Sequence, residues 1–208
     1  MKNICFLIFI VFLTYCQKPK ANIFSIENNK IKLKIYYSKK DSINLFMDSL
    51  IIRNDRDKYQ TLNLVSFDIM ISTSNLENIL TFNKDFNFDG YNDIEIYRPD
   101  LSGYNSLSNH FLFNKESGNY ETNLSLDSIY NIELLVEKKE LCSKWHAGLS
   151  AFYLTKYNWQ KNKLNIVNKL VQSNSIDGKI YLTIIEKNKI ISKDSIIAKS
   201  FVDSMMCN

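Results

Sequence analysis

Hydrophobic and polar residues alternate along much of the chain from residue 23 onward, and many of the hydrophobic positions are β-branched or aromatic. A period of two is typical of half-buried β-strands, because successive side chains of a strand point to opposite faces of the sheet. The clearest case is the segment 31–35, where isoleucine and leucine alternate with lysine. The same pattern predicts strands at 43–46, 50–53, 62–71, 94–97, 110–113, 131–136, 151–159, 163–168 and 179–186.

Short groups of Asn, Asp, Ser, Lys and Gly separate these segments and favour turns. No sustained amphipathic helix is evident; helix is expected at most over a turn or two near 75–80 and 195–202. The sequence therefore predicts a mostly β fold, a single antiparallel β-sandwich or barrel-like domain. No linker rich in Pro, Gly or Ser divides it, so we expect one domain over residues 23–208.

Composition narrows the class of protein. The chain has 208 residues with 45% hydrophobic and 13% aromatic content, which indicates a folded globule and not a disordered chain. Its formal net charge is +4, and its lysines and arginines are spread along the sequence. A nucleic-acid-binding protein is expected to cluster its basic residues, so we expect no nucleic-acid partner.

Residues 1–16 form a separate element. Lys2 is followed by an apolar run over 4–13, which is too short to span a bilayer but suits the hydrophobic region of a signal peptide. The run ends at Leu13-Thr14-Tyr15-Cys16, which resembles a bacterial lipobox, although Tyr15 replaces the usual small residue. We expect export, lipidation of Cys16, a tether at 17–22 and membrane anchoring toward the periplasm or the cell surface. A plain signal peptide and an uncleaved anchor are the alternatives.

Two cysteines remain in the mature chain, Cys142 and Cys207. In an oxidising envelope two thiols can pair, and this bridge would fasten the C-terminal tail to the domain. Two free or buried thiols are the alternative.

The segment 85–93, Asp-Phe-Asn-Phe-Asp-Gly-Tyr-Asn-Asp, carries the pattern of a calcium loop. Ca²⁺ takes roughly six to eight oxygen ligands, so a short segment must curl until several oxygens face one centre. The expected ligands are the side chains of Asp85, Asn87, Asp89 and Asp93 and the backbone carbonyl of Tyr91. The glycine between Asp89 and Tyr91 permits the sharp bend.

The alternatives to this calcium loop are an EF-hand and a turn without a metal. An EF-hand needs a bidentate Glu at its twelfth position, where this chain has Ile96, and the residues after the loop alternate like a strand. A metal-free turn rich in Asn, Asp and Gly is the second alternative. The pattern occurs once, which argues against a propeller with one such loop in each blade.

The loop, the strand after it and the later Tyr157-Asn158-Trp159 hairpin together resemble a family of small bacterial envelope lipoproteins. That family includes the calcium-dependent immunity proteins of bacteria-killing type IV secretion systems, which inhibit peptidoglycan hydrolases of the lysozyme superfamily. The resemblance covers roughly residues 82–164. It implies a β-rich fold, a bound calcium and a protein partner.

Periplasmic lysozyme inhibitors of this kind often insert a loop containing Ser and Gly into the hydrolase cleft. Ser102-Gly103-Tyr104 resembles the start of such a loop, and with Asn105 it forms the predicted partner-binding segment. Tyr104 offers a large contact area with a polar tip. The aromatic residue expected further on is replaced by Leu107, and an ordinary solvated loop is the alternative.

The sequence offers few candidate catalytic residues. Cys142 and His146 are close along the chain and could form a nucleophile and its base, but no third orienting group is evident. We therefore expect a non-enzymatic envelope lipoprotein that binds a protein partner, with a peptidoglycan hydrolase as the candidate. The alternative is a calcium-dependent glycan-binding or surface-adhesion module.

Overall fold

The computed structural model divides the chain into two compact units, residues 1–68 and 69–208. Each unit is described by itself. The structure describes residues 22–27, 31–39, 44–54, 59–64, 70–72, 79–99, 105–148, 151–174, 180–186 and 189–194.

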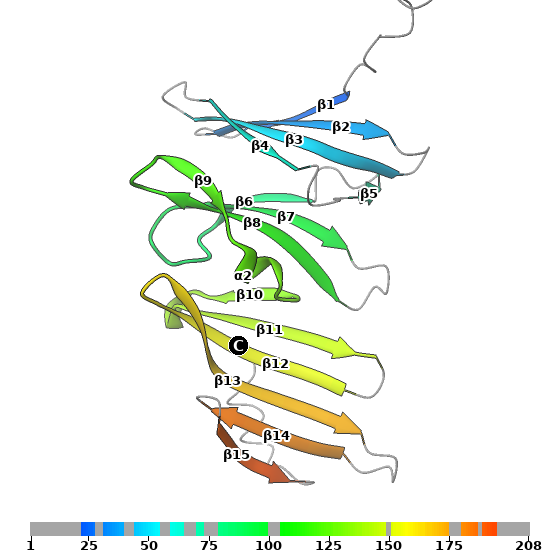
Figure 1. Ribbon diagram of the computed structural model, residues 1–208, viewed down its shortest axis with the longest axis vertical. Coiled ribbons are helices and arrows are strands. Elements are labelled where there is room, and N and C mark those ends of the chain that lie inside the picture. Colours follow the sequence, from blue (N-terminus) through cyan, green and yellow to red (C-terminus); the bar gives the residue numbers. More distant parts are fainter. Residues whose placement is uncertain are drawn as a thin grey trace, which may run out of the picture. The chain divides into compact units, whose positions relative to one another are not determined.

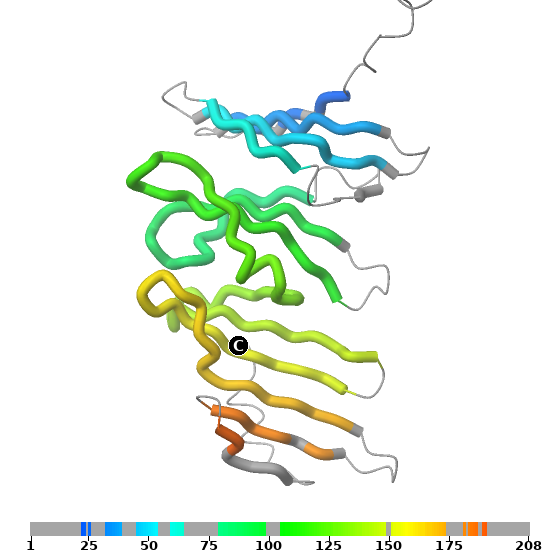
Figure 2. Tube along the Cα trace, viewed as in Figure 1, coloured from blue at the N-terminus to red at the C-terminus, as the bar shows by residue number. Residues whose placement is uncertain are grey.

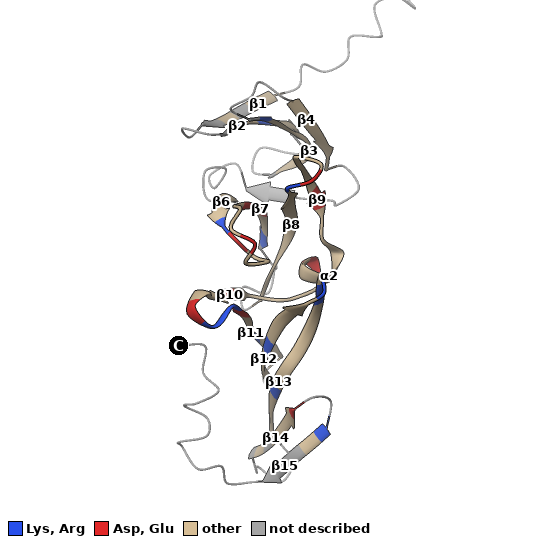
Figure 3. Cartoon of the chain, turned by 90° about the vertical axis from the view of Figure 1, so that its left-hand side faces the viewer, with Lys and Arg blue, Asp and Glu red and all other residues tan. Residues whose placement is uncertain are grey.

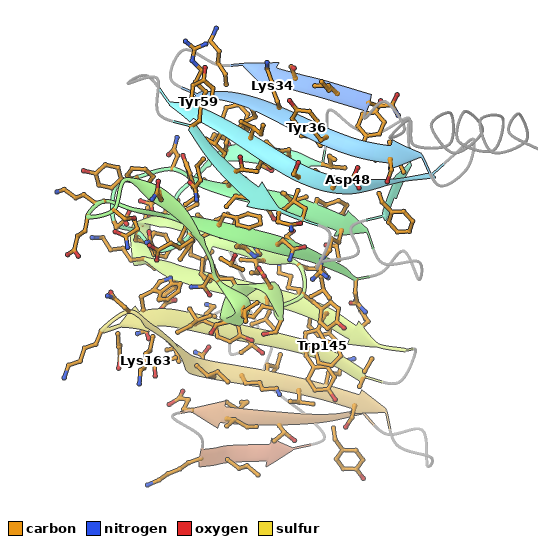
Figure 4. The ribbon with its side chains drawn as sticks, turned by 45° about the horizontal axis from the view of Figure 1, so that its top comes forward. Lys34, Tyr36, Asp48, Tyr59, Trp145 and Lys163 are labelled. Carbon is orange, nitrogen blue, oxygen red and sulfur yellow. The ribbon has the colours of Figure 1, made fainter. Side chains whose placement is uncertain are left out.

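The first unit contains an antiparallel sheet in the order β1-β2-β3-β4 (Figure 1). Leu33 and Ile35 of β2 are fully buried, whereas Lys32 and Lys34 between them are exposed, as the alternation predicts. Figure 4 labels Lys34 on this sheet. The strands are β1 (Asn22–Glu27), β2 (Ile31–Lys39), β3 (Asn44–Asn54) and β4 (Tyr59–Asn63).

The second unit begins with the short strand β5 (Met70–Ser72) and contains two further antiparallel sheets. The four-stranded sheet runs in the order β6-β7-β8-β9, a succession of hairpins. A short helix follows it and leads into the second sheet (Figure 2). The elements are β6 (Leu80–Lys84), β7 (Asp93–Pro99), β8 (Ser106–Asn114), β9 (Asn119–Thr122) and α2 (Leu124–Asp127).

The six-stranded sheet also pairs its strands in chain order. Its central hairpin turns at Lys161 and Asn162, which have φ angles of 51° and 60°. A two-residue hairpin loop with positive φ at both positions matches the twist of its strands, and Asn tolerates this conformation. The elements are β10 (Ile132–Leu135), the 3₁₀ turn η3 (Val136–Lys138), β11 (Glu140–Ala147), β12 (Ala151–Gln160), β13 (Lys163–Asn174), β14 (Ile180–Glu186) and β15 (Lys189–Asp194).

A hydrophobic cluster joins the two sheets of this unit. Its buried members are Phe86 from the loop between β6 and β7, Leu126 from α2, Ile129, and Leu141 from β11. Half-buried side chains of the β12–β13 hairpin, including Trp159, pack against them. The cluster fixes the predicted calcium loop against the six-stranded sheet.

The predicted mostly β, antiparallel fold is confirmed. The described strands lie in three sheets, and the chain divides after residue 68, where we expected one sandwich or barrel-like domain. The segments 43–46 and 50–53 belong to one strand, β3, and the segment 62–71 falls into β4 and β5. Residues 1–21 and 195–208, which include the predicted signal segment and the helix predicted at 195–202, lie outside the described residues. Of the helical turn predicted near 75–80, residues 75–78 also lie outside them, and Leu80 begins strand β6. Within the described ranges, no helix has the length and apolar character needed to cross a membrane.

Candidate functional site

The segment 85–93 forms a tight loop between β6 and β7, closed by bonds from backbone amides to side chains. The carboxylate of Asp85 accepts hydrogen bonds from the amide nitrogens of Asp89 at 3.1 Å and Gly90 at 2.8 Å. Phe88 and Gly90 have φ angles of 58° and 89°, so the chain bends in the left-handed region at alternate positions. The loop is not helical, as the sequence predicts.

The side chains of Asn87 and Asp89 meet inside the loop. Asn87 Nδ2 donates to Asp89 Oδ2 at 2.9 Å, and Asn87 Oδ1 accepts a longer bond of 3.3 Å from the Asp89 amide. The other carboxylate oxygen of Asp89 accepts from the Tyr91 amide at 2.9 Å. Three of the predicted ligands, including Asp85, are therefore linked by the loop's own hydrogen bonds.

Asp93 lies at the base of the loop and is completely buried. Its carboxylate accepts hydrogen bonds from the amides of Phe86 at 2.7 Å and Phe113 at 2.9 Å, which tie the loop to β8. Burial raises the pKa of Asp93 to about 7, against the lowering effect of these two bonds, and the charges of Asp85 and Asp89 raise it further. The loop therefore holds a buried carboxylate whose negative charge is unfavourable without a cation.

The loop is also attached to the β12–β13 hairpin. The indole Nε1 of Trp159 donates to the carbonyl oxygen of Phe86 at 2.8 Å. The ring of Phe86 packs edge-on against the imidazole of His110, with 4.6 Å between the ring centroids. The two sequence motifs that carry the family resemblance, the loop and the Tyr-x-Trp hairpin, are thus in direct contact.

The loop's chemistry can be compared with what Ca²⁺ requires. Among the described residues, no group of three His, Cys, Asp or Glu side chains is placed to hold a metal ion by itself. A 180° rotation of the Asn87 amide would turn its oxygen toward the carboxylate of Asp89. Two such oxygens repel each other without a cation, but with a cation between them both can serve as ligands. Figure 3 shows red acidic positions in the loop between β6 and β7, and within the described part of the chain none of its carboxylates pairs with Lys, Arg or His. The donor set fits a hard cation, and calcium binding stays a prediction.

Of the predicted partner-binding segment, Asn105 is described, and Ser102, Gly103 and Tyr104 lie outside the described residues. Asn105 forms two hydrogen bonds with the backbone of His146 in β11: its Nδ2 donates to the carbonyl at 2.8 Å, and its Oδ1 accepts from the amide at 2.9 Å. Asn105 therefore ties the residue before β8 to the six-stranded sheet.

The predicted cysteine and lipidation sites are only partly described. Cys142 is fully buried in a second cluster with Leu154, Leu170 and Ile184, and it is disulfide-bonded. Its expected partner Cys207 and the expected lipidation site Cys16 lie outside the described residues. The sulfur of Cys142 is therefore bonded and buried, whereas the side chain of His146 is exposed.

A polar cavity of about 320 Å³ in the four-stranded sheet was not predicted. Glu95 of β7 is buried in its wall and accepts hydrogen bonds from Lys84 Nζ at 2.7 Å and Ser108 Oγ at 2.9 Å. His110 of β8 is fully buried, with its Nδ1 3.2 Å from Asp127 Oδ1. The walls consist of Thr81, Lys84, Glu95, Tyr97, Ser106, Ser108, His110, Ile129, Asn131 and Ile132.

The alternating sequence pattern does not predict this cavity. In the run 94–96 a glutamate between two isoleucines predicts a solvent-facing carboxylate, yet both faces of β7 are buried here. The wall residues come from β6, β7, β8, the segment between α2 and β10, and the first residue of β10, so the strand register and the tertiary fold bring them together.

Comparison with known proteins gives a fold relationship. No family model matches the chain, and no curated protein matches its sequence significantly. A solved Xanthomonas structure, described as a type IV secretion system related protein, superposes with a TM-score of 0.63 at 13% identity, covering 85% of this chain and 95% of that one. A Bacteroides fragilis protein of unknown function aligns over 88% of this chain and 96% of that one, at 8% identity and a TM-score of 0.25. The chain therefore has the fold of the Xanthomonas protein.

Proposed function

We propose that this chain is a non-enzymatic lipoprotein of the bacterial envelope, associated with a type IV secretion system, whose calcium-stabilised β unit binds and inhibits a lysozyme-type peptidoglycan hydrolase. The single observation that carries the calcium part is the loop 85–93. Its side-chain oxygens are drawn inward by backbone amides, and it ends on a buried carboxylate with an elevated pKa. A cation bound there would offset the mutual repulsion of the carboxylates.

The loop is well placed to stiffen neighbouring segments. It is tied to β8 through Asp93 and to the β12–β13 hairpin through Trp159. The segment 101–104 connects β7 and β8, and Asn105 anchors its end. An ion bound in the loop would therefore hold β7, β8 and the β12–β13 hairpin together as a rigid scaffold for a partner.

The fold relationship supports the proposed setting. The Xanthomonas protein that shares this fold is related to a type IV secretion system. A secretion system that delivers cell-wall hydrolases requires a protective inhibitor in the envelope of the producing cell. The signal-like segment 1–16 and Cys16 supply the means of export and anchoring in this proposal.

Inhibition of a lysozyme-type hydrolase tests the proposal. The full chain, purified in detergent, is added to the hydrolase and a peptidoglycan suspension, and the clearing of turbidity is followed with Ca²⁺ or with a chelator. We expect inhibition with Ca²⁺, loss of inhibition with chelator, and loss in Asp89→Ala at low Ca²⁺. Glu116→Ala is the matched control, because it removes an equal charge from the exposed β8–β9 turn. Unchanged clearing across lysozyme-type hydrolases of several families, with Ca²⁺ present, would contradict the proposal.

A further inference from the structure

We propose that the polar cavity between β6, β7 and β8 is a binding site for a neutral sugar ring that carries two adjacent hydroxyl groups. This inference needs neither a bound calcium nor a hydrolase partner. The site is built from Glu95, His110 and Lys84.

An unpartnered buried nitrogen is the first observation. The Nε2 atom of His110 is buried and has no hydrogen-bond partner, and the whole side chain is 1% exposed. Asp127 Oδ1 accepts from the backbone amide of His110 at 2.6 Å and lies 3.2 Å from its Nδ1, a position that in the neutral form of the ring selects the tautomer with the proton on Nδ1. Nε2 is then an acceptor that requires a donor from a ligand or from water.

The second observation is the separation between His110 and Glu95. Nε2 of His110 lies 3.9 Å from Oε1 of Glu95, which is too far for a direct hydrogen bond. Glu95 Oε1 already accepts from Ser108 and has a second lone pair. Two acceptors side by side match two O–H donors on adjacent carbon atoms, the arrangement of a vicinal diol.

The charges and the size of the cavity favour a neutral ligand over an ionic one. Glu95 is paired with Lys84 Nζ at 2.7 Å, so an ammonium ligand would meet the charge of Lys84 and a carboxylate ligand that of Glu95. A neutral hydroxyl both donates and accepts, and so suits this mixture of Lys84, carboxylate and wall hydroxyl groups. Tyr97, 38% exposed, contributes an aromatic surface to the wall, and the volume of about 320 Å³ lies at the lower end of small-molecule sites.

Sugar binding can be measured directly through the NMR signals of the histidine ring nitrogens. The chain has two histidines, so a long-range ¹H–¹⁵N spectrum of the full chain shows two rings, and His146→Gln assigns them. On titration with N-acetylglucosamine, which has adjacent hydroxyls, we expect the Nε2 signal of His110 to shift and saturate, while the ring of His146 stays unchanged. Tetrahydropyran-2-methanol, a neutral ring without adjacent hydroxyls, should leave both rings unchanged.

Two variants and one matched control complete the test. Glu95→Gln replaces the charged acceptor by a neutral amide and should weaken the binding about tenfold, as expected when a charge-assisted hydrogen bond becomes a neutral one. Glu133→Gln removes the same charge from another Lys–Glu pair, with Lys144 at 3.1 Å, and should bind as wild type. If Glu95→Gln does not fold, Tyr97→Ala at the half-exposed wall tests the same site and should also weaken the binding.

Three results would overturn the inference: no shift of the His110 signal at saturating sugar, an equal response to the ring without adjacent hydroxyls, or saturation by methylammonium but not by sugar. The first would mean that ordered water alone satisfies Nε2. Loss of calcium binding would not affect the expected shifts, so failure of this site and failure of the proposed function are distinguishable.

Discussion

Asp93 should make the metal-free protein less stable as the pH rises. Its pKa in the folded state is about 7, against an ordinary value of 3.8, so the folded state holds this proton more tightly than the unfolded state. A carboxyl group with a raised pKa contributes no penalty below pH 3.8, and it destabilises the fold progressively as the pH rises from there to 7. The full difference corresponds to about 4 kcal/mol, of which about 2 kcal/mol falls between pH 5 and pH 7.

Urea unfolding in chelator at several pH values measures this effect. Both tryptophans, Trp145 (labelled in Figure 4) and Trp159, belong to the unit 69–208, so their fluorescence reports on the unit that contains Asp93. Asp93→Asn cannot titrate and is the control. The stability of wild type minus that of Asp93→Asn should fall by about 2 kcal/mol from pH 5 to pH 7.

Calcium should reverse the trend. A cation beside Asp93 favours the ionised carboxylate, so with saturating Ca²⁺ the fall in stability between pH 5 and 7 should disappear, and the affinity for Ca²⁺ should rise with pH over this range. A difference between wild type and Asp93→Asn that stays constant or rises from pH 5 to pH 7 in chelator would refute the reasoning about this buried carboxylate.

Three further substitutions test local parts of the structure by the same unfolding measurement. Gly90→Ala should cost about 1–2 kcal/mol because of backbone strain alone, since φ is 89° and no atom lies within 4 Å of the new Cβ; no loss would contradict the positive φ. Asn105→Ala removes two hydrogen bonds to β11 and should cost about 1–2 kcal/mol, whereas Asn119→Ala on the exposed β9 edge should cost little. Trp159→Phe should cost about 1 kcal/mol because it leaves the buried carbonyl of Phe86 without its indole donor, and an unchanged midpoint would argue against that bond.

Features made by neighbouring residues were predictable from the sequence. The loop 85–93 is contiguous, so the spacing of its Asp and Asn residues was enough to predict a sharp non-helical bend that leads into a strand. The β12–β13 hairpin followed from two alternating segments around Lys161 and Asn162. Both depend on local backbone preferences, which act over a few residues.

Features made by distant residues were not predictable. The cavity depends on the register that places Glu95 opposite His110 and on a helix that brings Asp127 behind it. The alternation does not predict β11, because Ser143 interrupts the apolar face formed by Leu141 and Trp145. The division after residue 68 has no Pro, Gly or Ser linker, and three sheets instead of one result from pairings that alternation alone does not specify.

Calorimetric titration of the full chain with Ca²⁺ is the most direct measurement of the central claim, that the loop 85–93 holds a calcium ion. We predict one binding event per chain in wild type and in the Glu116→Ala control, and greatly weakened binding in Asp89→Ala. An absence of binding heat in wild type, together with unfolding curves that Ca²⁺ leaves unchanged, would contradict it.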